Sequence, residues 1–137
     1  MLLLMAFLAR PTDYESLRTY QRDRWGMLND GETCVIELSG LAANSFAVLR
    51  NRDECRSERI AVIRQRIRTY KPALVVMYGK KDKKHWEEIS EGAFPDDDIR
   101  RLDSTILAFT PHPSRPTRPR EYWTEWGERL RQVANPS

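Results

Sequence analysis

Four short stretches of nearly uninterrupted apolar residues stand out along the chain, at residues 2–7, 34–39, 73–79 and 105–110. They do not alternate between apolar and polar positions, which is the pattern of β-strands covered on both faces. The segments between them show helical spacing instead. The spacing is clearest at residues 57–70, where Ile60, Ile63 and Ile67 fall on one stripe, and Pro72 ends the segment.

Three further segments, 12–25, 83–94 and 120–133, predict helices, the first of them capped by Thr12 or Asp13. Strands and helices therefore alternate along the chain. This order predicts an α/β fold: a three-layer αβα domain spanning residues 1–137, with a four-stranded parallel sheet and helices on both faces. In such a sheet, ligands bind where the carboxyl ends of the strands meet.

Composition narrows the class of protein only slightly. The 23 basic and 20 acidic residues give a net charge of +3, which is mildly basic. The two cysteines cannot form a disulfide framework or a four-thiolate metal site, so we expect no metal, no cofactor and a cytoplasmic location. The N-terminal apolar stretch is too short to span a bilayer and has no basic region before it, so we interpret it as a first strand and expect no membrane contact.

Two of the segments that follow predicted strands are strongly basic. Lys80 and Lys81 follow the third stretch, and Arg115 and Arg118 follow the fourth. Because both segments would lie on the same rim of the sheet, their clustered cations predict contacts with the phosphate backbone of DNA. Solvated charged loops are the simpler alternative.

His112 lies between Pro111 and Pro113, directly after the fourth stretch. Each proline restricts the backbone beside the histidine, so the imidazole is held without a large ordering cost. This suits a group that stabilises charge in a transition state. The alternative is a histidine that only ends a strand.

The stretch TILAFTPHPSRPTRPREYWTEW, at residues 105–126, resembles the last strand and following loop of the uracil-DNA glycosylase superfamily. IAVIRQRIRTYKPALVVMYG, at 60–79, resembles the family's helix ending in Lys-Pro and its third strand. The resemblance covers the whole chain in order. It implies that His112 contacts the carbonyl oxygen of a flipped-out base, and that the loop from Ser114 to Arg118, with Arg115 within it, presses into the DNA.

The same resemblance implies hydrolysis of the N-glycosidic bond of a damaged base, which has to leave the stack to be reached. Asn44 would supply an amide to the base and Phe46 an aromatic face, unless both only begin a helix. The stretch LARPTDY takes the place of the family's Gly-x-x-Pro motif, with Arg10 in the position of an acidic or amide residue and Asp13 as the nearest carboxylate. We therefore assign Asp13 to catalysis and Arg10 to substrate binding.

Other functions remain open at this point. The departure in LARPTDY favours a catalytically impaired relative that binds nucleic acid or a protein. A small anionic ligand is a third possibility. Because the first predicted strand has an uncovered edge, a partner or a second copy of the chain would cover it. Aromatic rings at Tyr122 and Trp126 would stack on bases of a single strand, although their helical spacing favours a place in the core.

Overall fold

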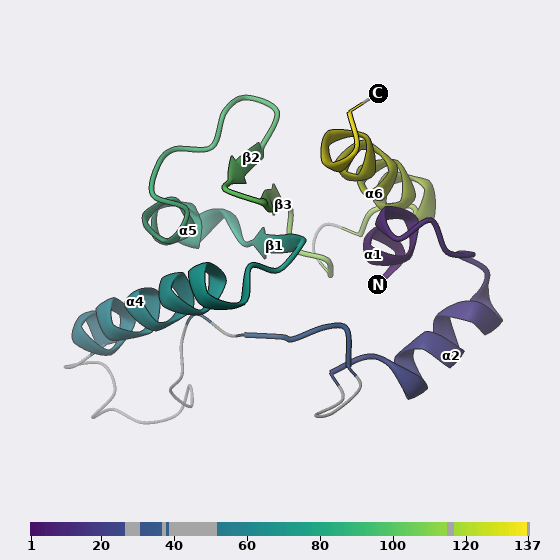
Figure 1. Ribbon diagram of the computed structural model, residues 1–137, viewed down its shortest axis with the longest axis horizontal. Helices are drawn as coiled ribbons and strands as arrows, with labels where there is room; N and C mark the ends of the chain where they lie inside the picture. The colour runs from purple at the N-terminus through teal and green to yellow at the C-terminus, as the bar shows by residue number, and fades with distance from the viewer. Residues whose placement is uncertain (27–30, 37, 39–51, 115–116, 137) are drawn as a thin grey trace. The chain divides into compact units, whose positions relative to one another are not determined.

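The computed structural model describes residues 1–26, 31–36, 38, 52–114 and 117–136. Tertiary contacts divide the chain into two compact units, one made of Met1–Val35 with Pro111–Ser137 and the other of Ile36–Thr110. We call them the terminal unit and the sheet unit. The terminal unit is thus assembled from two separate stretches, and the sheet unit from the stretch between them. Figure 1 labels the helices and strands of both.

The sheet unit is built on a three-stranded sheet in the order β1-β3-β2. β1 (Leu74–Tyr78) pairs in parallel with β3 (Thr105–Thr110), and β2 (Ile99–Leu102) pairs with β3 in antiparallel orientation. β1 and β3 confirm the strands predicted at 73–79 and 105–110, and a mixed α/β class is confirmed. The four-stranded parallel sheet is wrong, because the described residues form three strands in a mixed sheet.

Helix α4 (Arg52–Tyr70) supplies one wall of the core in the sheet unit. Ile60, Ile63 and Ile67 are 4–6% exposed, so the predicted apolar stripe faces the interior. They pack with residues of β1, β3 and α5 (Lys83–Ile89), namely Met77, Leu107, Phe109 and Ile89. Among the described residues, no helix, the 19-residue α4 included, is both long enough and apolar enough to cross a membrane.

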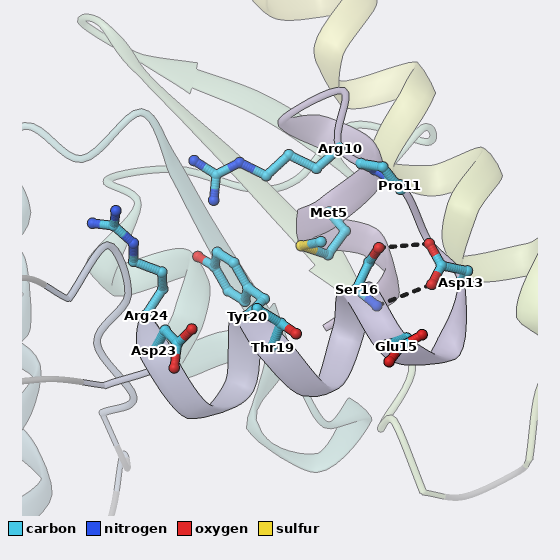
Figure 2. Close-up of a pocket in the computed structure, with 10 residues that line it drawn as sticks. All are labelled: Met5, Arg10, Pro11, Asp13, Glu15, Ser16, Thr19, Tyr20, Asp23 and Arg24. Atoms are coloured by element: carbon cyan, nitrogen blue, oxygen red, sulfur yellow. Dashed lines mark hydrogen bonds between the residues drawn. The ribbon is translucent and has the colours of Figure 1, made fainter.

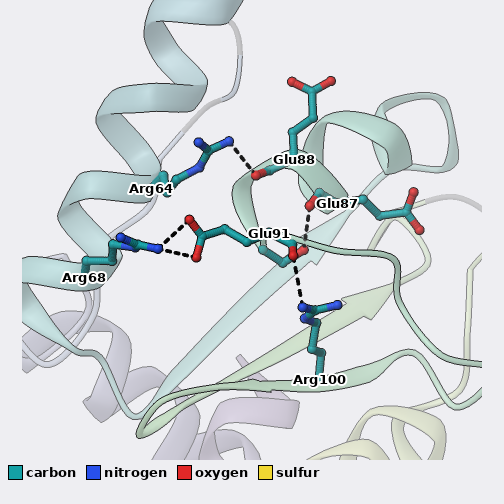
Figure 3. Close-up of polar contacts among 7 residues, drawn as sticks. Arg64, Arg68, Glu87, Glu88, Glu91 and Arg100 are labelled. Atoms are coloured by element: carbon teal, nitrogen blue, oxygen red, sulfur yellow. Dashed lines mark hydrogen bonds and ion pairs between the residues drawn. The ribbon is translucent and has the colours of Figure 1, made fainter.

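Arginine side chains hold the C-terminal end of α5 (Figure 3). Arg64 of α4 donates to the backbone oxygen of Glu88 at 2.6 Å, and Arg68 pairs with the Glu91 carboxylate. Arg100 of β2 donates to the backbone oxygens of Glu91 and Ala93 at 3.1 and 3.0 Å. The last carbonyl groups of a helix lack partners within it and carry partial negative charge, and Arg64 satisfies one of them. Arg68 and Arg100 bind the residues that follow α5, so they connect α4 and β2 to the turn after the helix.

The terminal unit contains α1 (Leu2–Phe7), α2 (Tyr14–Asp23) and α6 (Arg120–Ala134), and α1 lies against α6 (Figure 1). The predicted first strand at 2–7 is therefore wrong, since those residues are helical. The reason is Gly127: a Cβ there would lie 2.6 Å from the Cβ of Ala6, so the missing side chain lets the two helices touch. The expectation that a partner covers a first-strand edge loses its basis, because that edge does not exist.

The predicted second strand, at 34–39, is also not observed. Among its described positions, Cys34, Val35, Ile36 and Leu38 are outside any strand. Leu38 is buried in the core of the sheet unit and Ile36 packs against that core, while Val35 is 61% exposed. The apolar character of this segment is therefore used for packing rather than for strand pairing.

Candidate nucleic-acid interface

His112 lies on an exposed turn that directly follows β3 and belongs to the terminal unit. Its Nδ1 accepts a hydrogen bond from the backbone N–H of Ser114 at 3.2 Å, and the Ser114 hydroxyl lies 2.8 Å from the same nitrogen. A neutral imidazole carries one N–H. Because Nδ1 is the acceptor, the proton of the neutral ring is on Nε2.

Helix α6, which begins at Arg120, presents two different faces. Gly127 and Leu130 are buried on the face toward α1. Tyr122 and Trp126 lie one helical turn apart on a neighbouring face, and both are half-buried. The α1–α6 packing therefore fixes the direction in which the second face points within the terminal unit.

Two guanidinium groups cover the rings of the second face. The Cζ of Arg118 lies 5.1 Å from the centroid of Tyr122, and the Cζ of Arg129 lies 5.0 Å from the centroid of Trp126. Both arginines are exposed. We call Arg118, Tyr122, Trp126 and Arg129 the arginine–aromatic stripe. It combines positive charge with flat π-surfaces along α6 and the residues that directly precede the helix.

The sequence predicted a DNA contact for only one of these four residues, Arg118. For Tyr122 and Trp126 it left stacking on bases open but favoured a place in the core, and Arg129 was not selected. The signal that could have identified the stripe is the run of arginine and aromatic residues at i, i+4, i+8 and i+11, starting from Arg118.

Arg10 and Asp13 lie in one open pocket of about 410 Å³, together with Tyr20 and Arg24 (Figure 2). Arg10 forms a two-pronged ion pair with Glu32, with nitrogen–oxygen distances of 2.7 and 2.9 Å, and its guanidinium lies 5.3 Å from the ring centre of Tyr20. The hydrogen bond from Arg10 lowers the pKa of Glu32, and the reciprocal bond raises the pKa of Arg10. Two of the predicted site residues are thus brought together.

The Asp13 carboxylate has a structural task in this pocket. Its Oδ1 accepts from the backbone N–H of Ser16 at 3.0 Å and its Oδ2 accepts from the Ser16 hydroxyl at 2.6 Å (Figure 2). Asp13 is therefore the N-cap of α2, as the sequence predicted. The bonds from Ser16 lower the pKa of Asp13, so this carboxylate is held as an anion rather than tuned toward proton transfer.

The remaining predicted residues are not all placed with these groups. Lys80 and Lys81 are exposed in the short helix η1 (Lys80–Asp82), which follows β1 in the sheet unit. Asn44, Phe46 and Arg115 lie outside the described residues. Ser114 and Arg118 belong to the terminal unit, beside the turn and on the stripe respectively.

Comparison with family models, with curated proteins and with solved structures gave no match.

Proposed function

We propose that the protein binds single-stranded DNA through one face of the terminal unit. The face consists of the arginine–aromatic stripe. The observation that carries the proposal is the pairing of each ring with a guanidinium, Arg118 over Tyr122 at 5.1 Å and Arg129 over Trp126 at 5.0 Å. Unstacked bases bind to such surfaces by stacking on rings and on guanidinium planes.

The spacing of the stripe fits a strand whose bases are separated. Tyr122 and Trp126 are four residues apart on α6, which corresponds to about 6 Å along the helix axis. Neighbouring nucleotides of one strand can therefore each reach a ring. Base–aromatic stacking contributes about 1–3 kcal/mol per base, and the arginines add phosphate contacts that weaken with salt.

The half-buried rings also favour a single strand over a duplex. In a duplex the bases hide their flat faces in the stack and show only their edges to a protein. The stripe offers flat surfaces and guanidinium groups in place of a row of amide side chains that would read base edges. Its recognition would thus be tolerant of sequence.

Fluorescence anisotropy with a labelled oligothymidine tests this proposal at several salt concentrations. We expect Arg118→Ala and Arg129→Ala each to weaken binding about tenfold, and each to reduce the slope of log K against log salt by about 0.7. Arg18→Ala is the matched control, because Arg18 also covers a ring, that of Tyr14 at 5.7 Å, but on α2. Equal losses in all three variants, or affinity that does not respond to salt, would refute the stripe as the binding face.

A second candidate function is hydrolysis of an N-glycosidic bond, in a divergent protein of the uracil-DNA glycosylase type with a three-layer αβα arrangement. The observation that favours it is the His112–Ser114 turn, which leaves the proton of the neutral imidazole on Nε2. An Nε2–H group can donate to the carbonyl oxygen of a departing base, where negative charge develops. We assign this role to His112. The carboxylate of Asp13, which the sequence assigned to catalysis, accepts the capping bonds from Ser16.

Oligonucleotides containing uracil, hypoxanthine or xanthine separate the two functions. Hydrolysis leaves an abasic site, which alkali converts into a strand break that can be seen on a gel. We expect His112→Ala to abolish the product while DNA affinity stays within twofold of wild type. Absence of product from the wild-type protein with all three lesions at high enzyme concentration would remove the hydrolytic function and leave the binding proposal intact.

A further inference from the structure

The two edges of the three-stranded sheet differ in how they are protected. β2 carries Arg100 and Arg101 at its centre, and charged side chains discourage an edge strand from pairing with another chain. β1 has the sequence LVVMY, with no charge and no proline. Val76 and Tyr78 are 37% and 39% exposed on this strand. Within the part of the chain that the structure describes, β1 is therefore the open edge of the sheet.

The pairing register shows which backbone groups of β1 point outward. Ile106 donates to the oxygen of Ala73 at 3.0 Å, and Leu74 is aligned with Ile106 and Val76 with Ala108. In a parallel pair, alternate residues of a strand bond to one neighbour. Ala73, Val75 and Met77 therefore bond to β3, and the N–H and C=O groups of Leu74 and Val76 point away from it.

At the C-terminal end of β1, a side chain already occupies the outer edge of the strand. The Nε1–H of Trp86 in α5 donates to the backbone oxygen of Tyr78 at 2.9 Å, so that outward carbonyl already has a partner. Leu74 and Val76 keep a short row of donors and acceptors, and no bond to that row is present among the described residues. These donors and acceptors could pair with a few residues of an added strand.

Charge at both ends of β1 indicates the chemistry of the occupant. Lys71 precedes the strand, and Lys80 and Lys81 follow it; all three are exposed. Asp82 is the carboxylate in the turn after the strand. A second copy of β1 paired in antiparallel orientation would bring Lys71 of one chain toward Lys80 and Lys81 of the other, which is unfavourable. A segment with acidic flanks gains attraction at both ends instead.

We propose that the open edge of β1 binds an extended segment of another protein, with apolar residues at its centre and acidic residues at its ends. The outward groups of Leu74 and Val76 would pair with its backbone, and the Val76 side chain would contact its apolar centre. Lys71, Lys80 and Lys81 would select the acidic flanks. The proposal concerns the sheet unit and does not depend on DNA binding by the terminal unit.

A labelled peptide of sequence EEVTVTVEE tests the proposal by fluorescence anisotropy, with KKVTVTVKK as the charge-reversed control. We expect the acidic peptide to bind at least tenfold more tightly than the basic one. Val76→Lys should weaken its binding at least tenfold by placing a charge at the edge. Val62→Lys is the matched control, because Val62 is 39% exposed on α4, and it should change binding less than twofold. Thermal melting checks that both variants are folded.

Amide hydrogen exchange locates the bound peptide. We expect the N–H groups of Leu74 and Val76 to gain protection when the peptide is added, while those of Val75 and Met77 are protected throughout. Three results would overturn the proposal: equal binding of both peptides, equal affinity of the two valine variants, or unchanged exchange at Leu74 and Val76. A protein that is dimeric alone and becomes monomeric in Val76→Lys would show that a second copy occupies the edge, which also overturns it.

Discussion

Gly127 of α6 and Leu3 of α1 approach each other so closely that a Cβ on Gly127 would lie 2.2 Å from the backbone oxygen of Leu3. The next contacts of such a Cβ would be the Cβ of Ala6 at 2.6 Å and the backbone nitrogen of Phe7 at 2.9 Å. Two of these atoms belong to the backbone and cannot rotate away. The α1–α6 pair therefore depends on the absence of a single side chain.

Gly127→Ala should destabilise the protein by about 1–3 kcal/mol, the cost of forcing a methyl group into a filled space. Helix propensity alone would have the opposite effect, because alanine is favoured over glycine in a helix by about 1 kcal/mol. The sign of the change in stability therefore shows whether the close contact outweighs helix propensity. Chemical denaturation with urea measures the change. An increase in stability would show that α1 does not pack on α6 at this residue. Thr124→Ala, one turn earlier on α6, serves as the control for helix propensity.

Arg100→Ala should lower stability by about 1–3 kcal/mol, because it leaves the backbone oxygens of Glu91 and Ala93 without their donor. Arg66→Ala, at an exposed position of α4, removes the same charge and should change stability by less than about 0.5 kcal/mol. Thermal melting of the two variants makes the comparison. Similar melting temperatures would show that the arginine contributes only charge.

Gly92→Ala offers a second test of the same contact. A Cβ at Gly92 would lie 2.1 Å from Nη1 of Arg100, so the guanidinium has to leave its position over the turn. We expect a destabilisation no larger than that of Arg100→Ala, because the flexible arginine can move to solvent. In the double variant the two effects should not add, since both remove the same hydrogen bonds. Additive losses would contradict this link.

Acid should destabilise the folded protein below about pH 4. The pKa values of Asp13, Glu32 and Glu91 are lowered in the folded state, chiefly by hydrogen bonds from Ser16, Arg10 and Arg68 respectively. The stability that a lowered carboxyl pKa contributes is present above the unfolded-state pKa and is lost as the pH falls through the folded-state pKa. Melting temperatures between pH 7 and pH 3 measure this loss.

Asp13→Asn separates the cap of α2 from its charge. Asparagine caps helices about as well as aspartate, so the melting temperature at pH 7 should stay near that of wild type. The fall between pH 5 and pH 3 should be smaller, because one titrating carboxylate is gone. Glu58→Gln, at an exposed position of α4, is the control. A variant whose pH dependence matches wild type would show that Asp13 does not contribute to the acid transition.

The tautomer of His112 can be observed directly. Long-range proton–nitrogen correlation spectra at neutral pH should show the proton on Nε2, because Nδ1 accepts from the N–H of Ser114. Ser114→Ala keeps this backbone donor and should keep the tautomer, whereas Ser114→Pro removes the donor and should mix the two forms. A proton on Nδ1 in the wild-type protein would remove the observation that favours hydrolysis.

The elements predicted correctly are those whose type follows from the sequence pattern within the element itself. β3 was predicted at its observed bounds, and α4 shows the expected stripe of Ile60, Ile63 and Ile67. Residues 2–7 were misassigned because six apolar residues in a row fit a buried strand and a buried helix equally well. The deciding feature was Gly127, which lies far away in the sequence and provides the space for a helix.

β2 was missed for the opposite reason. Its four residues, IRRL, have two arginines at the centre, so they do not form the apolar run by which the other strands were predicted. The strand forms because β3 offers an edge and because the guanidinium of Arg100 binds backbone oxygens of the turn after α5. Among the candidate site residues, local signals identified Asp13 as a cap, but the ion pair of Arg10 with Glu32 joins positions that no local pattern connects.

The terminal unit is composed of two stretches separated by the whole sheet unit. During synthesis on a ribosome, α1 emerges before the sheet unit but cannot pack on α6 until that helix has been translated and released, whereas the described strands of the sheet unit are all available before then. A nascent chain would thus carry the apolar side of α1 uncovered while the whole sheet unit is translated, in the period when chaperones act on unfinished proteins.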